Sequence, residues 1–78
     1  MEYDRDKIDE MALALLFLTL HDGHRVWKGL DWEVSKRLHE KGWIHDPVGK
    51  AKSLVLTEEG LARCRELFAK HFATDKAS

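Results

Sequence analysis

Apolar residues recur at helical spacing on two opposite sides of the first third of the chain. Alternating charges over residues 4–7 offer Asp4 or Asp6 as the N-cap of a helix, and Gly23 is placed to end it. The pattern therefore predicts a helix over roughly residues 5–21. One apolar stripe consists of Ile8, Met11, Ala12, Leu15 and Leu18, and the opposite stripe consists of Leu13, Phe17 and Leu20.

A helix that is apolar on all sides is normally buried on all sides. A chain of 78 residues has little material with which to surround one helix completely. We therefore expect the second stripe to contact another subunit, with Leu13, Phe17 and Leu20 as dimer-interface residues. The alternative is a central helix that is covered entirely by its own chain.

A second helix is predicted in the middle of the chain. Asp31 is placed as its N-cap and Gly42 as its end, which gives a helix over roughly residues 31–41. Its apolar stripe runs through Trp27, Leu30, Val34 and Leu38. Because the first two of these precede the cap, residues 24–30 are expected to form a short helical turn that leads into the helix.

After this helix, the spacing of apolar residues changes to that of strands. Residues 43–45 and 52–56 are β-prone, and residues 46–50 between them are rich in turn formers, so the pattern predicts a β-hairpin. The side chains expected to face the core are those of Ile44, Leu54 and Leu56.

The last predicted element is a helix over residues 57–72. Thr57 is placed as its N-cap, and two glutamates follow in its first turn, where the helix dipole favours acids. Cys64 lies on the apolar stripe of this helix, so we interpret it as a buried core thiol.

Composition supports one globular domain over residues 1–78. Hydrophobic residues make up 44% of the chain and charged residues 35%, which is the balance of a packed protein. No linker or repeat interrupts the sequence, and only residues 73–78 are expected to fray. The predicted fold is mainly α with a small β-hairpin, winged-helix-like in the order helix, short turn, helix, β-hairpin wing, helix.

The cellular setting is suggested by what the sequence lacks. A single cysteine cannot form an intramolecular disulfide, which is typical of proteins in a reducing cytoplasm. The longest uncharged apolar stretch, residues 11–20, is half the length that a membrane-spanning helix needs. It also lacks the basic leader and cleavage site of a signal peptide, so we expect a cytoplasmic protein.

Residues 38–61 contain a run Leu-His-Glu-Lys-Gly-Trp-Ile, an Asp-Pro turn, a basic segment and a run Leu-Thr-Glu-Glu-Gly. This segment resembles the wing region of winged-helix regulators of the multiple-antibiotic-resistance type. The resemblance implies a winged-helix fold and, as one option, DNA binding. Only residues 24–30 separate the first two predicted helices, however, so the helix-turn-helix of those regulators is shortened here.

The whole chain also resembles a family of short bacterial proteins of unknown function. The shared features are the run Trp-Lys-Gly-Leu-Asp-Trp at residues 27–32 and the segment at residues 42–60. This resemblance implies a bacterial, cytoplasmic protein and carries no activity with it.

Basic residues gather in the middle of a chain whose net charge is −1. The candidate nucleic-acid contacts are Lys36 and Arg37 on the second helix and Lys50 and Lys52 on the wing. Only Arg37 has a side chain typical of base reading, and Glu33 and Glu40 lie close to it in the sequence. The alternative is a charged face that is simply solvated.

Two histidines, His21 and His24, are weak candidates for metal ligands. Their spacing at a helix end lacks the regular arrangement of established zinc motifs, and the alternative is imidazoles that lie near the last helical carbonyls. The sequence contains no glycine-rich phosphate loop and no recognisable nucleophile motif. We therefore expect neither a cofactor nor catalysis.

Trp32 lies two residues before Val34 and therefore off the buried side of the second helix, which makes it a candidate partner contact. Packing under the wing or against the last helix is the alternative. Taken together, the residues predict a small cytoplasmic protein-interaction domain that forms a homodimer through its first helix. The alternative is a DNA-binding transcriptional regulator that uses the second helix and the wing.

Overall fold

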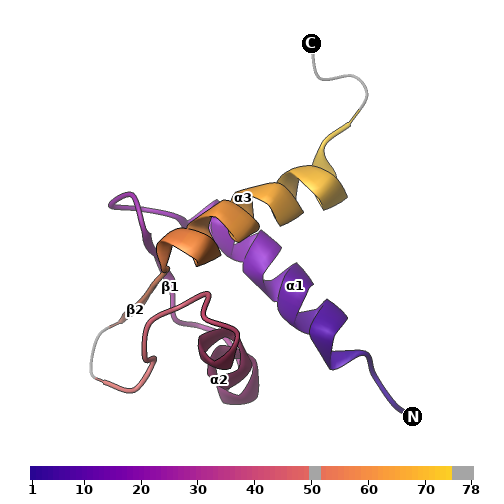
Figure 1. The fold of residues 1–78 in the computed structure, drawn as a ribbon, viewed down its shortest axis with the longest axis horizontal. Helices are drawn as coiled ribbons and strands as arrows, with labels where there is room; N and C mark the ends of the chain where they lie inside the picture. Colours follow the sequence, from indigo (N-terminus) through magenta and orange to yellow (C-terminus); the bar gives the residue numbers. More distant parts are fainter. Residues whose placement is uncertain (50–51, 75–78) are drawn as a thin grey trace.

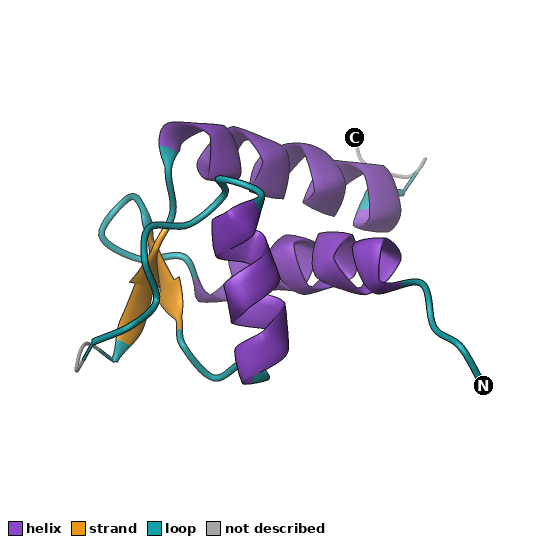
Figure 2. Ribbon diagram, turned by 60° about the horizontal axis from the view of Figure 1, so that its bottom comes forward, coloured by secondary structure: helices purple, strands orange, loops and turns teal. Residues whose placement is uncertain are grey.

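The computed structural model describes residues 1–49 and 52–74. It contains three helices, a short 3-10 turn and two strands (Figure 1). In chain order these are α1 (Arg5–Leu16), η1 (Phe17–Thr19), β1 (Arg25–Trp27), α2 (Trp32–Glu40), β2 (Ser53–Val55) and α3 (Glu58–Phe72). α3 packs against α1 and crosses it at an angle (Figure 1), and Figure 2 shows α2 beside them and the strand pair at one end. The predicted mainly α, winged-helix-like fold is confirmed in this arrangement.

The first helix begins where predicted but ends earlier. The Asp4 side chain caps it by accepting a hydrogen bond from the backbone N–H of Lys7 at 3.0 Å. Asp22 and Gly23 both adopt positive φ, at 52° and 80°, and the backbones of His21 and Arg25 exchange hydrogen bonds of 2.8 and 3.0 Å. Gly23 therefore belongs to a tight turn that leads into β1, because a residue pair with positive φ is typical of hairpin turns.

Residues 24–30 do not form the predicted helical turn, because β1 occupies this position. β1 pairs antiparallel with β2, with Val26 opposite Leu54. The burial of β1 alternates with period two, since only Val26 is buried while Trp27 is exposed. The residues around Trp27 therefore alternate as in a strand. The prediction that Trp27 extends the apolar stripe of the second helix is wrong.

The predicted wing is also rearranged. Of residues 43–45, Ile44 forms an antiparallel bridge with Leu56, and the backbone N–H of His45 donates to the carbonyl of Val55 at 2.9 Å. The main partner of β2 is β1, which the sequence did not suggest. The expected inward side chains of Ile44, Leu54 and Leu56 are all buried.

The start of α3 is tied to the end of α2. Thr57 Oγ1 accepts a hydrogen bond from the backbone N–H of Gly60 at 2.9 Å and donates to the carbonyl of Gly42 at 2.7 Å. A Cβ atom at Gly60 would lie 1.8 Å from the carbonyl oxygen of Trp43. Glycine is therefore required at this position so that α3 can approach the backbone of the preceding segment.

One hydrophobic core joins all three helices and both strands. Its buried members are Leu13, Ala14, Leu16, Val26, Val34, Leu38, Ile44, Leu54, Leu56, Cys64 and Leu67. Among the residues described, no helix has the length and apolar character needed to cross a membrane.

Candidate interaction site

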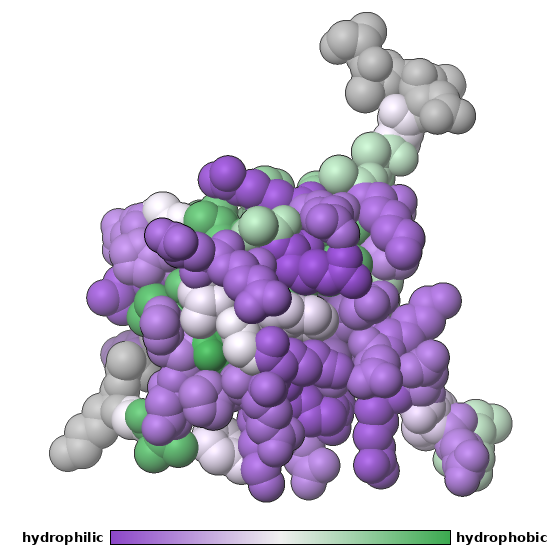
Figure 3. Space-filling model, in the orientation of Figure 1, coloured by the Kyte–Doolittle hydropathy of each residue, from purple (hydrophilic) through white to green (hydrophobic). Residues whose placement is uncertain are grey.

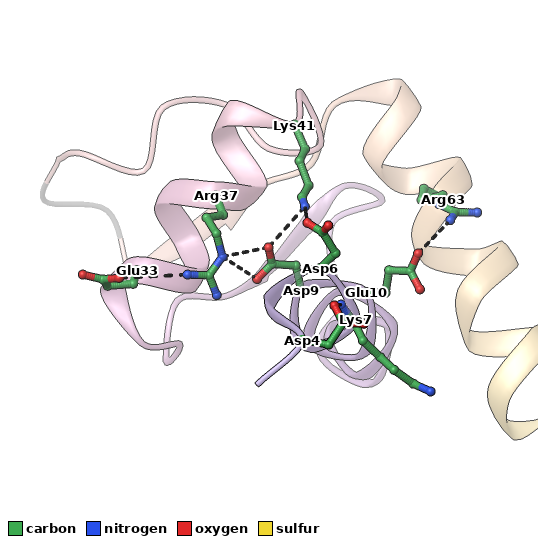
Figure 4. A network of polar contacts seen from close by, with 9 residues as sticks. All are labelled: Asp4, Asp6, Lys7, Asp9, Glu10, Glu33, Arg37, Lys41 and Arg63. Carbon is green, nitrogen blue, oxygen red and sulfur yellow. Dashed lines mark hydrogen bonds and ion pairs between the residues drawn. The ribbon is translucent and has the colours of Figure 1, made fainter. Parts of the chain in front are cut away.

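The inward side of α1 carries a buried carboxylate. Asp9 has no solvent exposure, and both of its oxygens accept hydrogen bonds from Nε of Arg37 in α2, at 2.8 and 3.0 Å (Figure 4). Nζ of Lys41, the residue that caps the C-terminus of α2, lies 3.3 Å from the same carboxylate. Two cations therefore compensate the single buried charge, which is the condition under which such a group is tolerated inside a protein.

Lys41 also reaches the exposed edge of this interface. Lys41 donates to Oδ1 of Asp6 at 2.8 Å, and this hydrogen bond lowers the pKa of Asp6 and raises that of Lys41. The hydrogen bond with Asp9 raises the pKa of Arg37. On its other flank α1 is linked to α3, because Arg63 lies 3.3 Å from the carboxylate of Glu10. Charged residues near the start of α1 thus fix its inward side to both neighbouring helices.

This network involves one of the residues that were predicted to contact nucleic acid. Arg37, a candidate for contact with nucleic acid, faces α1, because its guanidinium is held against Asp9. Lys36 and Lys52 are exposed, and Lys50 lies outside the described residues. Figure 3 shows hydrophilic side chains over α2, but the arginine expected to read bases is already engaged inside the protein.

The two stripes of α1 are placed the other way round from the prediction. Leu13 has no solvent exposure and lies in the core of its own chain. Phe17 packs on Phe68 with ring centroids 4.8 Å apart, and Leu20 also packs against the core. Leu13 is therefore unavailable for the predicted interface, and Phe17 and Leu20 are half-buried against the core of their own chain.

The exposed apolar surface is instead the stripe that was expected to face the core. Ile8 is 41% exposed, Leu15 48% and Leu18 71%, while Met11 and Ala12 are half-buried between them. No charged residue interrupts this stripe from residue 11 to residue 20. We call the residues Ile8, Met11, Ala12, Leu15 and Leu18 the outward face of α1.

Two shallow hollows lie along the outward face. One, of about 370 Å³, is lined by Tyr3, Asp4, Lys7, Ile8 and Met11 near the start of α1. The other, of about 360 Å³, lies near its end and is lined by Ala12, Leu15, Leu16, Thr19, Trp27, Gly29 and Leu30. The second hollow connects the outward face to β1, so the apolar surface extends beyond the helix.

The tryptophans on either side of residues 28–31 are both exposed. Trp27 was expected on the buried stripe of the second helix, but it lies on β1 with 66% of its surface exposed. Trp32 is 54% exposed at the start of α2, as its position off the buried side predicted. Trp27 lines a hollow that it shares with α1.

The structure does not bring the histidine candidates into a metal site. His21 and His24 are both exposed at the turn before β1, and Nδ1 of His21 lies 2.9 Å from the carbonyl of Thr19. Over residues 1–49 and 52–74, no cluster of three or more potential ligands of the His, Cys, Asp or Glu type is present.

Cys64 is buried as expected from its place on the stripe of α3. Its Sγ lies 3.2 Å from the carbonyl oxygen of Leu13, with the geometry of a thiol that donates a hydrogen bond. Burial raises the pKa of this thiol to about 11. The group is therefore protonated and unreactive near neutral pH.

The comparisons with known proteins agree with the resemblance of the whole chain to a family of short bacterial proteins. A family model described as a domain of unknown function (DUF6429) matches residues 4–74. An uncharacterised protein, y4hR, of Sinorhizobium fredii is 61% identical over 72 residues, which cover 92% of this chain and 97% of the relative. No solved structure matches. On these matches, the chain belongs to the DUF6429 family.

Proposed function

We propose that this chain is a small protein-interaction domain without catalytic activity or cofactor, and that it binds protein through the outward face of α1. The observation that carries the proposal is an exposed, uncharged helical face whose opposite side is fully engaged in the fold. Monomeric proteins rarely expose continuous apolar patches larger than a few hundred Å², and larger ones mark interaction sites.

The exposed residues are of the types that contribute most to protein–protein binding. Trp27 is a rigid aromatic side chain at the edge of the outward face, and tryptophan is enriched among residues that dominate interface energies. Leu15 and Ile8 supply aliphatic surface beside it. A central apolar area flanked by polar residues is the usual anatomy of an interface.

Site-specific photocrosslinking in bacterial cells tests this proposal. A photoreactive amino acid at position 15 is expected to form covalent adducts with protein, and the same group at position 36, on the exposed side of α2, is the matched control. Adducts from position 15 that disappear when Ile8→Lys is added would support the assignment. Equal adduct yields from positions 15 and 36, or none from position 15, would contradict it.

DNA binding through α2 and the wing is the alternative, and the resemblance of residues 38–61 to the wing of winged-helix regulators is its support. The engagement of Arg37 with Asp9 counts against it, because the remaining candidates are lysines that position a protein on phosphates without reading bases. A mobility-shift assay at low salt tests this alternative. Binding that weakens steeply with salt and with Lys36→Glu/Lys52→Glu would favour it over the interaction domain.

A further inference from the structure

The outward face of α1 has different features at its two ends. Near the start of the helix lies the hollow lined by Tyr3, Ile8 and Met11 together with Asp4 and Lys7. Near its end Trp27 is 66% exposed at the second hollow, beside Leu15. Both ends are hollowed, but only the end of the helix carries a large exposed tryptophan.

Trp27 is held in a fixed position relative to α1. Its backbone N–H donates to Oγ1 of Thr19 at 3.0 Å, and this hydroxyl donates to the carbonyl of Leu16 at 2.8 Å. Trp27 is also paired with Ser53 in the strand ladder. A side chain on a backbone fixed in this way loses little conformational entropy on binding, which favours its use as an anchor.

We propose that the partner of the outward face is a second copy of this chain, bound with the two α1 helices antiparallel. This inference rests on the proposed function and specifies its partner. The two-fold axis passes between Met11 and Ala12, so that each Trp27 enters the Tyr3, Ile8 and Met11 hollow of the other copy.

The spacing along α1 supports this register. An axis between residues 11 and 12 places Ile8 of one copy opposite Leu15 of the other, and Asp4 opposite Thr19, to which Trp27 is hydrogen bonded. Ala12 at the crossing point has a small side chain, which lets the two helices approach closely. A two-fold interface must match itself, and a surface with a recess at one end and an aromatic side chain at the other meets that condition only in the antiparallel sense.

The available area approaches that of a standard interface. The exposed parts of Tyr3, Ile8, Leu15, Leu18 and Trp27 amount to roughly 600 Å² of mainly apolar surface per copy, against about 800 Å² per partner in a standard interface. Rim residues would add to this area. A parallel arrangement would instead bring like ends together, hollow against hollow and Trp27 beside the Trp27 of the other copy.

Two measurements on the purified chain test the inference. In sedimentation equilibrium, the wild type is expected to reach twice the chain mass, and Trp27→Ala is expected to weaken association by at least about tenfold. Trp32→Ala is the matched control and is expected to leave association unchanged. Circular dichroism at low concentration checks that both variants fold. A wild type that stays monomeric at the highest soluble concentration would overturn the inference.

Disulfide formation tests the register. Ala12→Cys places a thiol beside the proposed axis and is expected to link two copies rapidly under mild oxidation, whereas Lys36→Cys on α2 is expected to link slowly. The buried Cys64 remains in both variants, with the wild type as reference. Equal linking rates would overturn the antiparallel register. A monomeric purified protein that still forms adducts from position 15 in cells would refute self-pairing while leaving the proposed function in place.

Discussion

The two sides of α1 have nearly the same apolar content but opposite roles. The inward side carries the buried carboxylate Asp9 together with Leu13 and is covered by α2 and α3. The outward face carries no charge beyond Ile8, yet Leu15 and Leu18 remain exposed. A charged residue on a helix therefore does not mark its solvent side when another element supplies compensating cations.

This difference also separates stability from binding. The inward side contributes to folding through packing and charge compensation, so changes there should act on the free energy of unfolding. The outward face contributes little to the folded monomer, so changes there should act on association. The variants below test that separation, and unfolding is to be measured at protein concentrations too low for association.

The largest expected difference is between Leu13→Ala and Leu15→Ala. Leu13 is fully buried, and its truncation is expected to lower the free energy of unfolding by about 2–4 kcal/mol through lost contacts and a cavity. Leu15 is half exposed, so its truncation is expected to cost less than about 1 kcal/mol. Urea unfolding followed by circular dichroism checks both. Similar losses for the two variants would show that the faces are not distinct.

The next effect concerns the buried carboxylate. Asp9→Asn keeps the shape of the side chain but removes the charge that Arg37 and Lys41 contact, and is expected to cost about 2 kcal/mol. Asp6→Asn, at the exposed edge of the same network, is expected to cost less. Thermal unfolding of the two variants measures the ranking. An Asp9→Asn variant as stable as the wild type would mean that this network does not hold α1 in place.

The free energy of unfolding at alkaline pH depends on Cys64, whose thiol contacts the inward side of α1. Its pKa is raised from 9.0 to about 11 in the folded protein, so the unfolded chain loses this proton first as the pH rises. Stability should therefore fall between pH 9 and 11, by about 1–2 kcal/mol from this group. In Cys64→Ala the free energy of unfolding is expected to depend less on pH over this range, which a series of unfolding measurements checks. A wild-type stability that stays level over this range would contradict the burial of the thiol.

The smallest effect is expected at acidic pH. The hydrogen bond with Lys41 lowers the pKa of Asp6, so this contact stabilises the fold above the ordinary carboxyl pKa of 3.8 and is lost as the pH falls below it. In Asp6→Asn the free energy of unfolding should decrease slightly less as the pH falls than it does in the wild type. High salt should reduce the difference between the two proteins, because Asp6 is exposed. A difference that salt leaves unchanged would argue against a screened ion pair.

Much of the fold could be predicted because its signals are local. The caps at Asp4 and Thr57, the extent of α3 and the burial of Ile44 and Leu54 all follow from short-range patterns that the structure confirms. The strand pairing could not be predicted in the same way. β1 has only three residues, and α2 lies between β1 and its partner β2 in the sequence. The residues around β1 therefore contain nothing that distinguishes it from a turn.

The orientation of α1 could not be predicted because it depends on a long-range ion pair. Asp9 lies on the same side of the helix as Leu13, and the Arg37 that compensates its charge is 28 residues away in the sequence. One signal was available: Arg37 and Lys41 follow the buried Val34 at three and seven residues, which places both cations toward the core side of α2. Because two cations on the core side of α2 need a compensating charge, this spacing favours an Asp9 carboxylate that faces α2.

The central claim is that the outward face and Trp27 bind a second copy of the chain, and fluorotryptophan NMR tests it most directly. Trp27 and Trp32 are similarly exposed in the monomer, at 66% and 54%, so Trp32 serves as an internal control. The chain has three tryptophans, and Trp27→Phe and Trp32→Phe identify which signals belong to Trp27 and Trp32. As the protein concentration rises, the Trp27 resonance is expected to shift while that of Trp32 stays in place. A Trp27 resonance that does not move, or a Trp32 resonance that moves equally, would contradict the account.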